Sequence, residues 1–185
     1  NLLGIGHALA FDMGGTTAKM CCIERGRPYH ANFFETARAR RFKKGSGLPL
    51  LIPVIELIEI GAGGGSIAHI DKLGLLKVGP RSAGANPGPA AYAQGGTEPT
   101  VTDADILLGY IDPARFLGGD MILDRDAAER AVREHVAQPL KRSTVAAAWG
   151  IFNVVNEAMV AAGKRYAAER ALDIRNFTLI TFGGA

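Results

Sequence analysis

The sequence is poor in cysteine, in aromatic residues and in excess charge of one sign. Cys21 and Cys22 are its only cysteines, and adjacent cysteines do not bridge each other, so we expect no disulfide framework and a reducing cytoplasm. The two would alternate across a strand, which predicts that one is buried. Aromatic residues are 7% of the chain, the formal net charge is +3, and basic residues are not interleaved with aromatic ones. This composition argues against a nucleic-acid partner.

Several motifs are also absent. No apolar run has the length expected of a membrane span, and no signal peptide is visible, so we expect no membrane partner. The chain has no Cys-x-x-Cys, His-Glu-x-x-His, G-x-S-x-G or Walker A motif, and its four histidines are scattered. The sequence therefore offers no evident zinc site, no serine nucleophile elbow and no Walker-type phosphate loop.

Apolar residues and glycine are plentiful. Apolar residues make up 48% of the 185 residues, enough for one domain with a full core. The chain begins at Asn1, close to an expected strand, and stops at Gly183-Gly184-Ala185 directly after an apolar run. Both ends predict that it is a piece of a longer protein.

The rest of the chain is organised around residues 11–17, which read Phe-Asp-Met-Gly-Gly-Thr-Thr. Apolar runs at 8–11 and 19–23 predict a strand, a tight turn and a second strand. The glycines would let backbone N–H groups approach an anion, the threonines would add hydroxyl donors, and Asp12 could hold Mg²⁺ directly or through its waters. An ordinary hairpin with a Gly-Gly turn is the alternative, and these residues alone leave both open.

Further strands are predicted where apolar residues follow one another between glycine or proline turns. A strand at 30–36 would complete an antiparallel meander with the two strands around the central turn. The other expected strands are 54–60, 66–71, 73–79 and 177–182. Residues 79–100, rich in glycine and proline, predict a stiff, shaped loop.

Three helices are expected, running from about 100 to 110, from 125 to 136 after a capping Asp124, and from 144 to about 172 after a capping Ser143. The third has an apolar stripe at helical spacing, so Trp149 and Met159 are expected in the core.

Three other features can be interpreted in two ways. The basic run at 38–44 is either a solvated loop or a flank for an anionic ligand or an acidic partner. Gly61–Ser66 predicts a loop with close backbone approach, but it lacks G-x-G-x-x-G spacing and precedes a strand, so it is not a Rossmann fingerprint. Thr102 or Asp103 would cap the first helix, although Asp103 could equally belong to a ligand site.

Six segments of the sequence resemble the hydantoinase A / 5-oxoprolinase family, the A-type subunits of ATP-dependent hydantoinases and oxoprolinases, to which acetone and acetophenone carboxylases are related. The segments follow the family's order: FDMGGTTAKM (11–20), EIGAGGGSIAHID (59–71), VGPRSAGANPGPAAY (78–92), GGTEPTVTDADILLG (95–109), FLGGDMILD (116–124) and LITFGGA (179–185). The resemblance implies an α/β fold: one RNase H-like half of the actin, sugar-kinase and Hsp70-type ATPases, with a mixed sheet and flanking helices. Residues 1–185 would be its second half, truncated at both ends, with 37–142 a family-specific insertion.

The resemblance also implies ATP and Mg²⁺ as cofactors, because residues 11–17 are similar to the family's second phosphate loop and residues 182–185 to its adenosine-side motif. Asp12 would hold the metal, and Asp12 and Asp103 would be the catalytic residues. The implied cofactor-binding residues are Asp12, Gly14, Gly15, Thr16, Thr17, Lys19, Gly63, Gly64, Gly183 and Gly184. Lys19 departs from the family, where an acid is common. A lysine cannot bind Mg²⁺ but can neutralise phosphate oxygens.

Three functions agree with the resemblance. The first is part of an ATP-dependent cyclic-amide hydrolase of the hydantoinase or 5-oxoprolinase type, in which ATP phosphorylates the substrate carbonyl before ring opening. The second is a subunit of an ATP-dependent ketone carboxylase. The third is an inactive fragment that serves folding or subunit interaction. The enzymatic readings imply a hetero-oligomer with a B-type subunit or domain, and the isolated chain is expected to be inactive.

Overall fold

The computed structural model describes residues 4–37, 39 and 45–184, and they form two compact units. The sheet unit comprises the described residues up to Asp12 together with Ala18–Ile60 and Val160–Gly183. The loop unit comprises Met13–Thr17, Gly61–Met159 and Gly184. The basic residues of the 38–44 run, for which two interpretations were given, lie outside the described residues: Arg38, Arg40, Arg41, Lys43 and Lys44.

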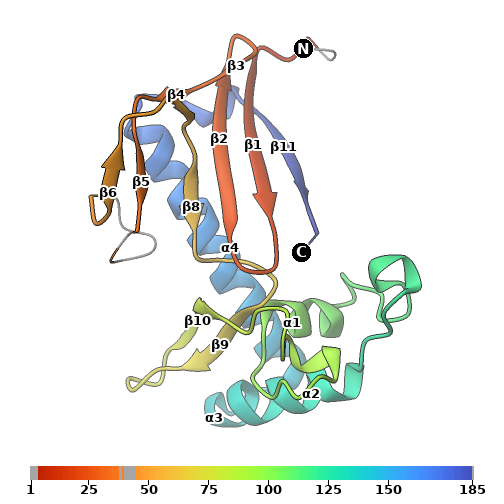
Figure 1. The fold of residues 1–185 in the computed structure, drawn as a ribbon. Helices are drawn as coiled ribbons and strands as arrows, with labels where there is room; N and C mark the ends of the chain where they lie inside the picture. The colour runs from red at the N-terminus through yellow and green to blue at the C-terminus, as the bar shows by residue number, and fades with distance from the viewer. Residues whose placement is uncertain (1–3, 38, 40–44, 185) are drawn as a thin grey trace. The chain divides into compact units, whose positions relative to one another are not determined.

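The sheet unit is built on a five-stranded sheet in the order β11-β1-β2-β3, with β8 also paired to β2 (Figure 1). Both β3 and β8 run antiparallel to β2: β3 pairs with its Ile23–Glu24 end and β8 with its Ala18–Met20 end. Two short strands thus share one edge of β2, and the expected strand, turn and strand around residues 11–17 are confirmed. The strands are β1 (His7–Met13), β2 (Ala18–Glu24), β3 (Arg27–Pro28), β8 (Ile58–Ile60) and β11 (Thr178–Gly183).

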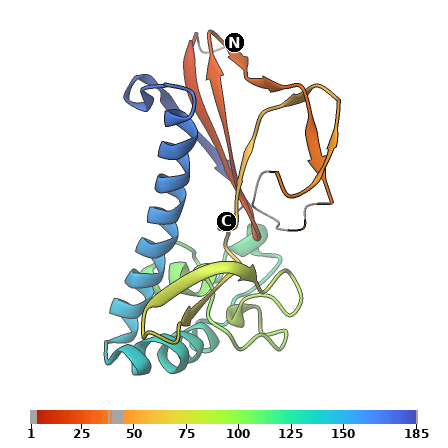
Figure 2. The ribbon, with the colours of Figure 1, turned by 90° about the vertical axis from the view of Figure 1, so that its left-hand side faces the viewer.

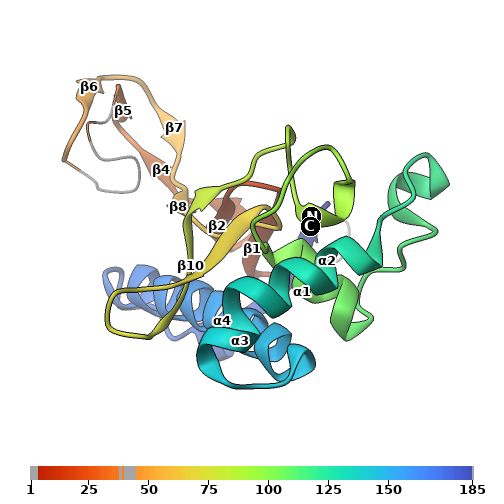
Figure 3. The same ribbon diagram turned by 90° about the horizontal axis from the view of Figure 1, so that it is seen from below.

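The expected third meander strand at 30–36 is wrong. That segment leaves the sheet as two short ribbons, β4 (His30–Ala31) with β7 (Val54–Ile55) and β5 (Phe34–Thr36) with β6 (Leu48–Leu50), and β5 and β6 lie apart from β1 and β2 in Figure 3. The strand beside β2 ends at Pro28, which has no N–H to continue a ladder, and β8 occupies the rest of that edge. The single strand expected at 54–60 is accordingly two strands, β7 and β8.

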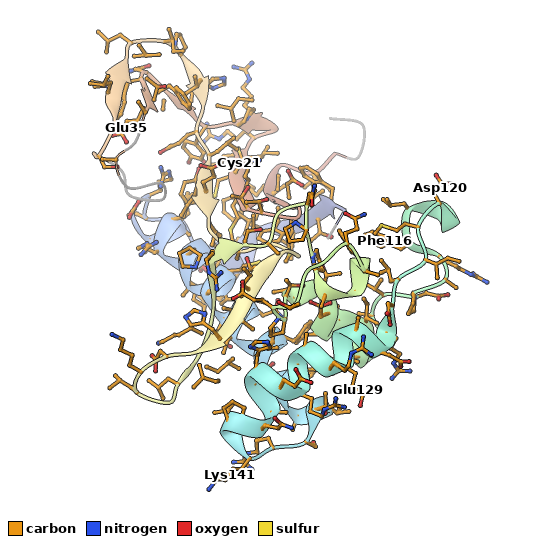
Figure 4. The ribbon with its side chains drawn as sticks, turned by 60° about the horizontal axis from the view of Figure 1, so that its bottom comes forward. Cys21, Glu35, Phe116, Asp120, Glu129 and Lys141 are labelled. Atoms are coloured by element: carbon orange, nitrogen blue, oxygen red, sulfur yellow. The ribbon has the colours of Figure 1, made fainter. Side chains whose placement is uncertain are left out.

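The loop unit joins a two-stranded ribbon to several helices. Strands β9 (Ser66–Ile70) and β10 (Leu76–Ser82) correspond to the strands expected at 66–71 and 73–79, the second of them shifted along the chain, and they pair antiparallel. Tyr92 and Phe116 (Figure 4) pack against a core cluster of buried residues: Ala91, Ile106, Leu123 and Ala128. The helices are η1 (Ala90–Tyr92), α1 (Val101–Leu108), η2 (Phe116–Gly119), α2 (Arg125–Val132), the π-helical η3 (Arg133–Ala137) and α3 (Gln138–Leu140). The carboxylate of Asp124 caps α2 as predicted, accepting from the Ala127 N–H at 2.9 Å.

Helix α4 (Thr144–Ala168) contributes residues to both units. Ser143 caps it as expected, its hydroxyl accepting from the Ala146 N–H at 3.3 Å. In the sheet unit its C-terminal part runs beside the strands (Figure 2). A Cβ built on Gly163 would lie 3.0 Å from the Met20 sulfur, so the helix packs closely against β2. By length and composition α4 could cross a membrane, contrary to the sequence expectation, although the same test is passed by core helices of soluble proteins. The buried stripe has the pattern of a core helix: Ala147, Ala148, Ile151, Val155, Met159, Ala162 and Tyr166. A short 3₁₀ turn, η4 (Ile174–Asn176), then leads to β11.

Two expectations about buried side chains need correction. Trp149 is 48% exposed and stacks on Phe152, which in turn stacks on Tyr110, so it lies outside the core in which Met159 is buried. Cys21 and Cys22 are both buried, whereas only one was expected to be, and neither forms a disulfide. Burial raises the pKa of Cys22 to about 11, which keeps this thiol protonated and unreactive near neutral pH.

Helix α1 carries a half-buried carboxylate, Asp105, one of whose oxygens is fully buried. Within the described ranges, Oδ1 of Asp105 is buried and makes no hydrogen bond. Burial raises the pKa of Asp105 to about 6. An ionised carboxylate without a donor is costly in such a place, so Asp105 is a source of instability whenever it is charged.

An ion pair fixes the end of α4 in the sheet unit. The Arg170 guanidinium binds both carboxylate oxygens of Glu56, donates to the Tyr166 carbonyl at 2.9 Å and stacks over the Tyr166 ring at 3.9 Å. The side chains of Arg170 and Glu56 are only 15% and 21% exposed.

Arg170→Ala is expected to lower the free energy of unfolding by about 2–4 kcal/mol, because it leaves the buried Glu56 charge without its guanidinium. Arg175→Ala is the matched control, since its ion pair with Asp173 is exposed to solvent and should contribute little to stability. Urea denaturation of both variants makes the comparison. Equal losses would contradict the structural role of the Arg170 pair.

Asp105→Asn is expected to stabilise the protein at high pH but not at low pH. The folded pKa of about 6 lies above the unfolded value of about 3.9, so the folded state binds more protons and stability falls as the pH rises from about 4 through about 6. Denaturation at pH 4 and pH 8 should show the variant gaining roughly 2 kcal/mol at pH 8 only. Asp120→Asn is the control, because Asp120 is exposed (Figure 4). A gain of equal size at both pH values would contradict the raised pKa.

Candidate functional site

The turn Gly14–Thr17 presents a row of unsatisfied donors. It is closed by a hydrogen bond from the Gly14 N–H to the Thr17 carbonyl at 3.1 Å. In the part of the chain that the structure describes, the N–H groups of Gly15, Thr16 and Thr17 and both threonine hydroxyls donate to no protein acceptor. Successive free backbone donors with adjacent hydroxyls form a concavity that suits an anion such as phosphate.

The space in front of this turn is open. A Cβ built on Gly15 would meet nothing within 4 Å, and one on Gly14 would meet only the Thr17 carbonyl oxygen, at 3.9 Å. Neither glycine has a positive φ. The fold of this chain therefore does not require glycine at either position. An anion that approaches the backbone closely would require it, because a side chain would stand in its way.

Gly63, Gly64 and Gly65 lie against the same turn from the opposite side of its peptide groups. Their buried backbone meets the turn directly: the Gly64 N–H donates to the Gly14 carbonyl at 3.1 Å and the Gly65 N–H to the Gly15 carbonyl at 2.7 Å. The structure thus brings residues 14–17 together with Gly63 and Gly64, as both sets were predicted to belong to one site. Whether these glycines contact a cofactor stays a prediction.

Asp103 is part of the scaffold behind this loop pair. Its carboxylate is fully buried and accepts four hydrogen bonds, from the N–H and hydroxyl of Thr100, both at 2.8 Å, from the Ala91 N–H at 2.8 Å and from the Ala90 N–H at 3.3 Å. Burial raises the pKa of Asp103, and these hydrogen bonds oppose the shift. The arrangement favours a structural role, and the catalytic role stays a prediction.

The N-cap of α1 is Thr100, not Thr102 or Asp103 as expected. Thr100 and Asp103 form a reciprocal capping box, in which each side chain accepts from the backbone N–H of the other residue. The sequence carries a signal that would have found it: a threonine followed three residues later by an acid, directly before an apolar run. Ser66 was also missed, and its buried hydroxyl accepts from the Gly63 N–H at 3.0 Å.

The remaining predicted site residues belong mostly to the sheet unit. Asp12 lies near the end of β1, half-buried, and its carboxylate has no hydrogen bond or ion pair with any described residue. Lys19 lies on β2 opposite Glu59 and lines a groove of about 640 Å³ with Phe33 and Val54 among its other walls. Gly183 ends β11, and Gly184 follows it in the loop unit, exposed. Their cofactor roles stay predictions.

No group of three or more metal-ligating side chains exists among the described residues. A lone carboxylate such as Asp12 fits Mg²⁺ that keeps most of its waters and is held chiefly by phosphate oxygens, because Mg²⁺ is commonly bound by one or two carboxylates in this way. It does not fit a metal caged by protein ligands alone.

Known proteins match over the full length of the chain. Residues 1–185 match the family model described as Hydantoinase/oxoprolinase. Caprolactamase subunit alpha of Pseudomonas jessenii is 46% identical over 182 residues, covering 98% of this chain and 25% of that protein. The acetophenone carboxylase gamma subunit of Aromatoleum aromaticum is 41% identical over 186 residues, covering 100% of this chain and 24% of that subunit.

Solved structures agree. The nucleotide-free structure of acetone carboxylase matches with a TM-score of 0.85 at 28% identity. The crystal structure of the ATP-dependent caprolactamase from Pseudomonas jessenii matches with a TM-score of 0.83 at 44% identity. Both matches cover 100% of this chain and 25% of the other, so the chain spans about a quarter of the relatives it matches. The predicted fold class is confirmed, a mixed α/β fold of the actin-like ATPase type. The chain belongs to the hydantoinase/oxoprolinase family.

Proposed function

We propose that the turn Gly14–Thr17 is a phosphate-binding loop for ATP, within an enzyme that uses ATP to open cyclic amides. The observation that carries the proposal is the row of unpartnered donors at Gly15, Thr16 and Thr17, in front of which the structure leaves open space. Anionic oxygens are the acceptors that such a row fits best, because hydrogen bonds to charged groups are the strong ones.

The relatives support ATP and a cyclic amide. The two solved structures named above are of proteins whose descriptions include ATP dependence. Caprolactamase, the relative with 46% identity, is named for a lactam, which is a cyclic amide. The acetophenone carboxylase gamma subunit, at 41% identity, supports a ketone carboxylase as the second candidate.

The chain's own residues have these roles in the proposal. The N–H groups of Gly15, Thr16 and Thr17 and the threonine hydroxyls hold phosphate oxygens, and Asp12 holds Mg²⁺ or one of its waters. Lys19 is proposed to neutralise phosphate charge. ATP, when bound, supplies a phosphoryl group that activates the stable amide oxygen. Positioning and charge neutralisation are what the loop contributes.

The complete protein is proposed to work with a partner. The relatives named above are subunits alpha and gamma of their enzymes, which supports a hetero-oligomer. We propose a B-type subunit or domain as the partner that completes ring opening, and the cytoplasm as the compartment.

Gly15→Val in the full-length protein is expected to weaken ATP binding at least tenfold, because the side chain fills the space in front of donors worth roughly 1.5–3 kcal/mol each. Stability should be nearly unchanged, since a Cβ on Gly15 meets nothing within 4 Å. Gly6→Val is the matched control, because Gly6 is equally open and lies outside the loop. Calorimetric titration with Mg·ATP measures both. Unchanged ATP affinity in Gly15→Val would remove the phosphate-loop assignment.

The reaction class can be tested with the full-length protein co-purified with its B-type partner. ADP release is followed with a panel of lactams and hydantoins and with small ketones, each with and without bicarbonate. We expect release driven by a cyclic amide and indifferent to bicarbonate, because hydrolysis uses none. Release that requires a ketone together with bicarbonate would instead establish the carboxylase.

A further inference from the structure

Three consecutive glycines, Gly63, Gly64 and Gly65, are buried against the phosphate-binding loop. We infer that they are positioning residues: they aim the loop's N–H donors at the phosphates and act on the nucleotide through residues 14–17, not by touching it. The inference rests on the proposed function of that loop. It assigns these glycines a different role from the direct cofactor contact that the sequence predicts.

The aim of the donors follows from the planarity of the peptide bond. The peptide bonds after Gly14 and Gly15 are trans, so each carbonyl points opposite to the N–H of the next residue. The Gly14 carbonyl is held toward the Gly64 N–H and the Gly15 carbonyl toward the Gly65 N–H. The N–H groups of Gly15 and Thr16 must therefore point away from the three glycines, toward the open side of the loop.

The glycines themselves have no donor left for a phosphate. The Gly63 N–H donates to the Ser66 hydroxyl, and the N–H groups of Gly64 and Gly65 donate to the loop carbonyls. All three residues are buried. Direct binding of an anion by their backbone would require breaking the bonds that hold the loop.

Close packing explains why glycine stands at these positions. A Cβ on Gly63 would lie 2.5 Å from the Gly14 carbonyl oxygen and 2.8 Å from the carbonyl carbons of Gly15 and Thr16. A Cβ on Gly65 would lie 2.8 Å from the Gly15 carbonyl oxygen. Each added methyl group would push the loop itself, because backbone atoms cannot move aside as a flexible side chain can.

A second layer holds the three glycines in place. The Gly64 carbonyl accepts from the Thr102 N–H and the Gly65 carbonyl from the Ala83 N–H, both at 2.8 Å. Thr102 lies in the first turn of α1, which the Thr100–Asp103 capping box fixes. Asp103 thus supports the loop through α1 and Gly64.

The test uses Gly65→Ala and Ser66→Ala in the full-length protein, titrated with ATP and with adenosine. ATP affinity should fall roughly tenfold or more in Gly65→Ala and by a smaller factor in Ser66→Ala, because misaimed donors lose charged hydrogen bonds. Adenosine affinity should not change, since it has no phosphate. Gly150→Ala is the matched control, as its Cβ meets only the end of the Leu76 side chain.

Ser66→Ala is the less disruptive variant, and it still tests the inference if Gly65→Ala does not fold. Wild-type ATP affinity in the folded variants would overturn the positioning role, and so would an equal loss of ATP and adenosine affinity, which would indicate a general structural defect. Neither result would contradict the phosphate-loop assignment, which the Gly15→Val variant tests separately.

Discussion

Two backbone hydrogen bonds, from Gly64 to Gly14 and from Gly65 to Gly15, are the constraint on which the candidate site depends. They join segments about fifty residues apart in the chain and convert a flexible Gly-Gly turn into a defined surface. A turn of this composition has many accessible conformations, and fixing it costs conformational entropy. The packing of Gly63 and Gly65, the Ser66 hydroxyl and the start of α1 supply the contacts that offset this cost.

Local patterns were enough to predict much of the fold. The strand, turn and strand around residues 11–17, the existence of strands near β9 and β10, and the helices with their caps at Asp124 and Ser143 all follow from short-range periodicity and capping chemistry. Two of the expectations that failed depend on contacts that short-range patterns do not show. The strand expected at 30–36 does not pair with β2, because β8 occupies that edge of β2. Trp149 lies outside the core, because Tyr110 and Phe152 form a ring stack with it at the surface.

In the candidate site, too, local patterns predict some features and only the structure shows the others. Glycines and threonines at 14–17 can be identified from the sequence as donors for an anion, and the structure adds that these donors have no partner in the described part of the chain. Sequence could not tell a glycine that faces a ligand from one that supports the loop behind it. The distinction between Gly15 and Gly65 lies in what a Cβ would meet, which is nothing in one case and a carbonyl oxygen in the other.

The exposed stack of Tyr110, Phe152 and Trp149 gives the molecule a built-in optical probe. Trp149 is the only tryptophan of the chain and belongs wholly to the loop unit. Because it is half-exposed and stacks on the Phe152 ring, its emission should respond to changes in solvent contact at α4. Fluorescence excited at tryptophan therefore reports on the unit that holds the turn Gly14–Thr17, without any label, because the sheet unit of this chain contains no tryptophan.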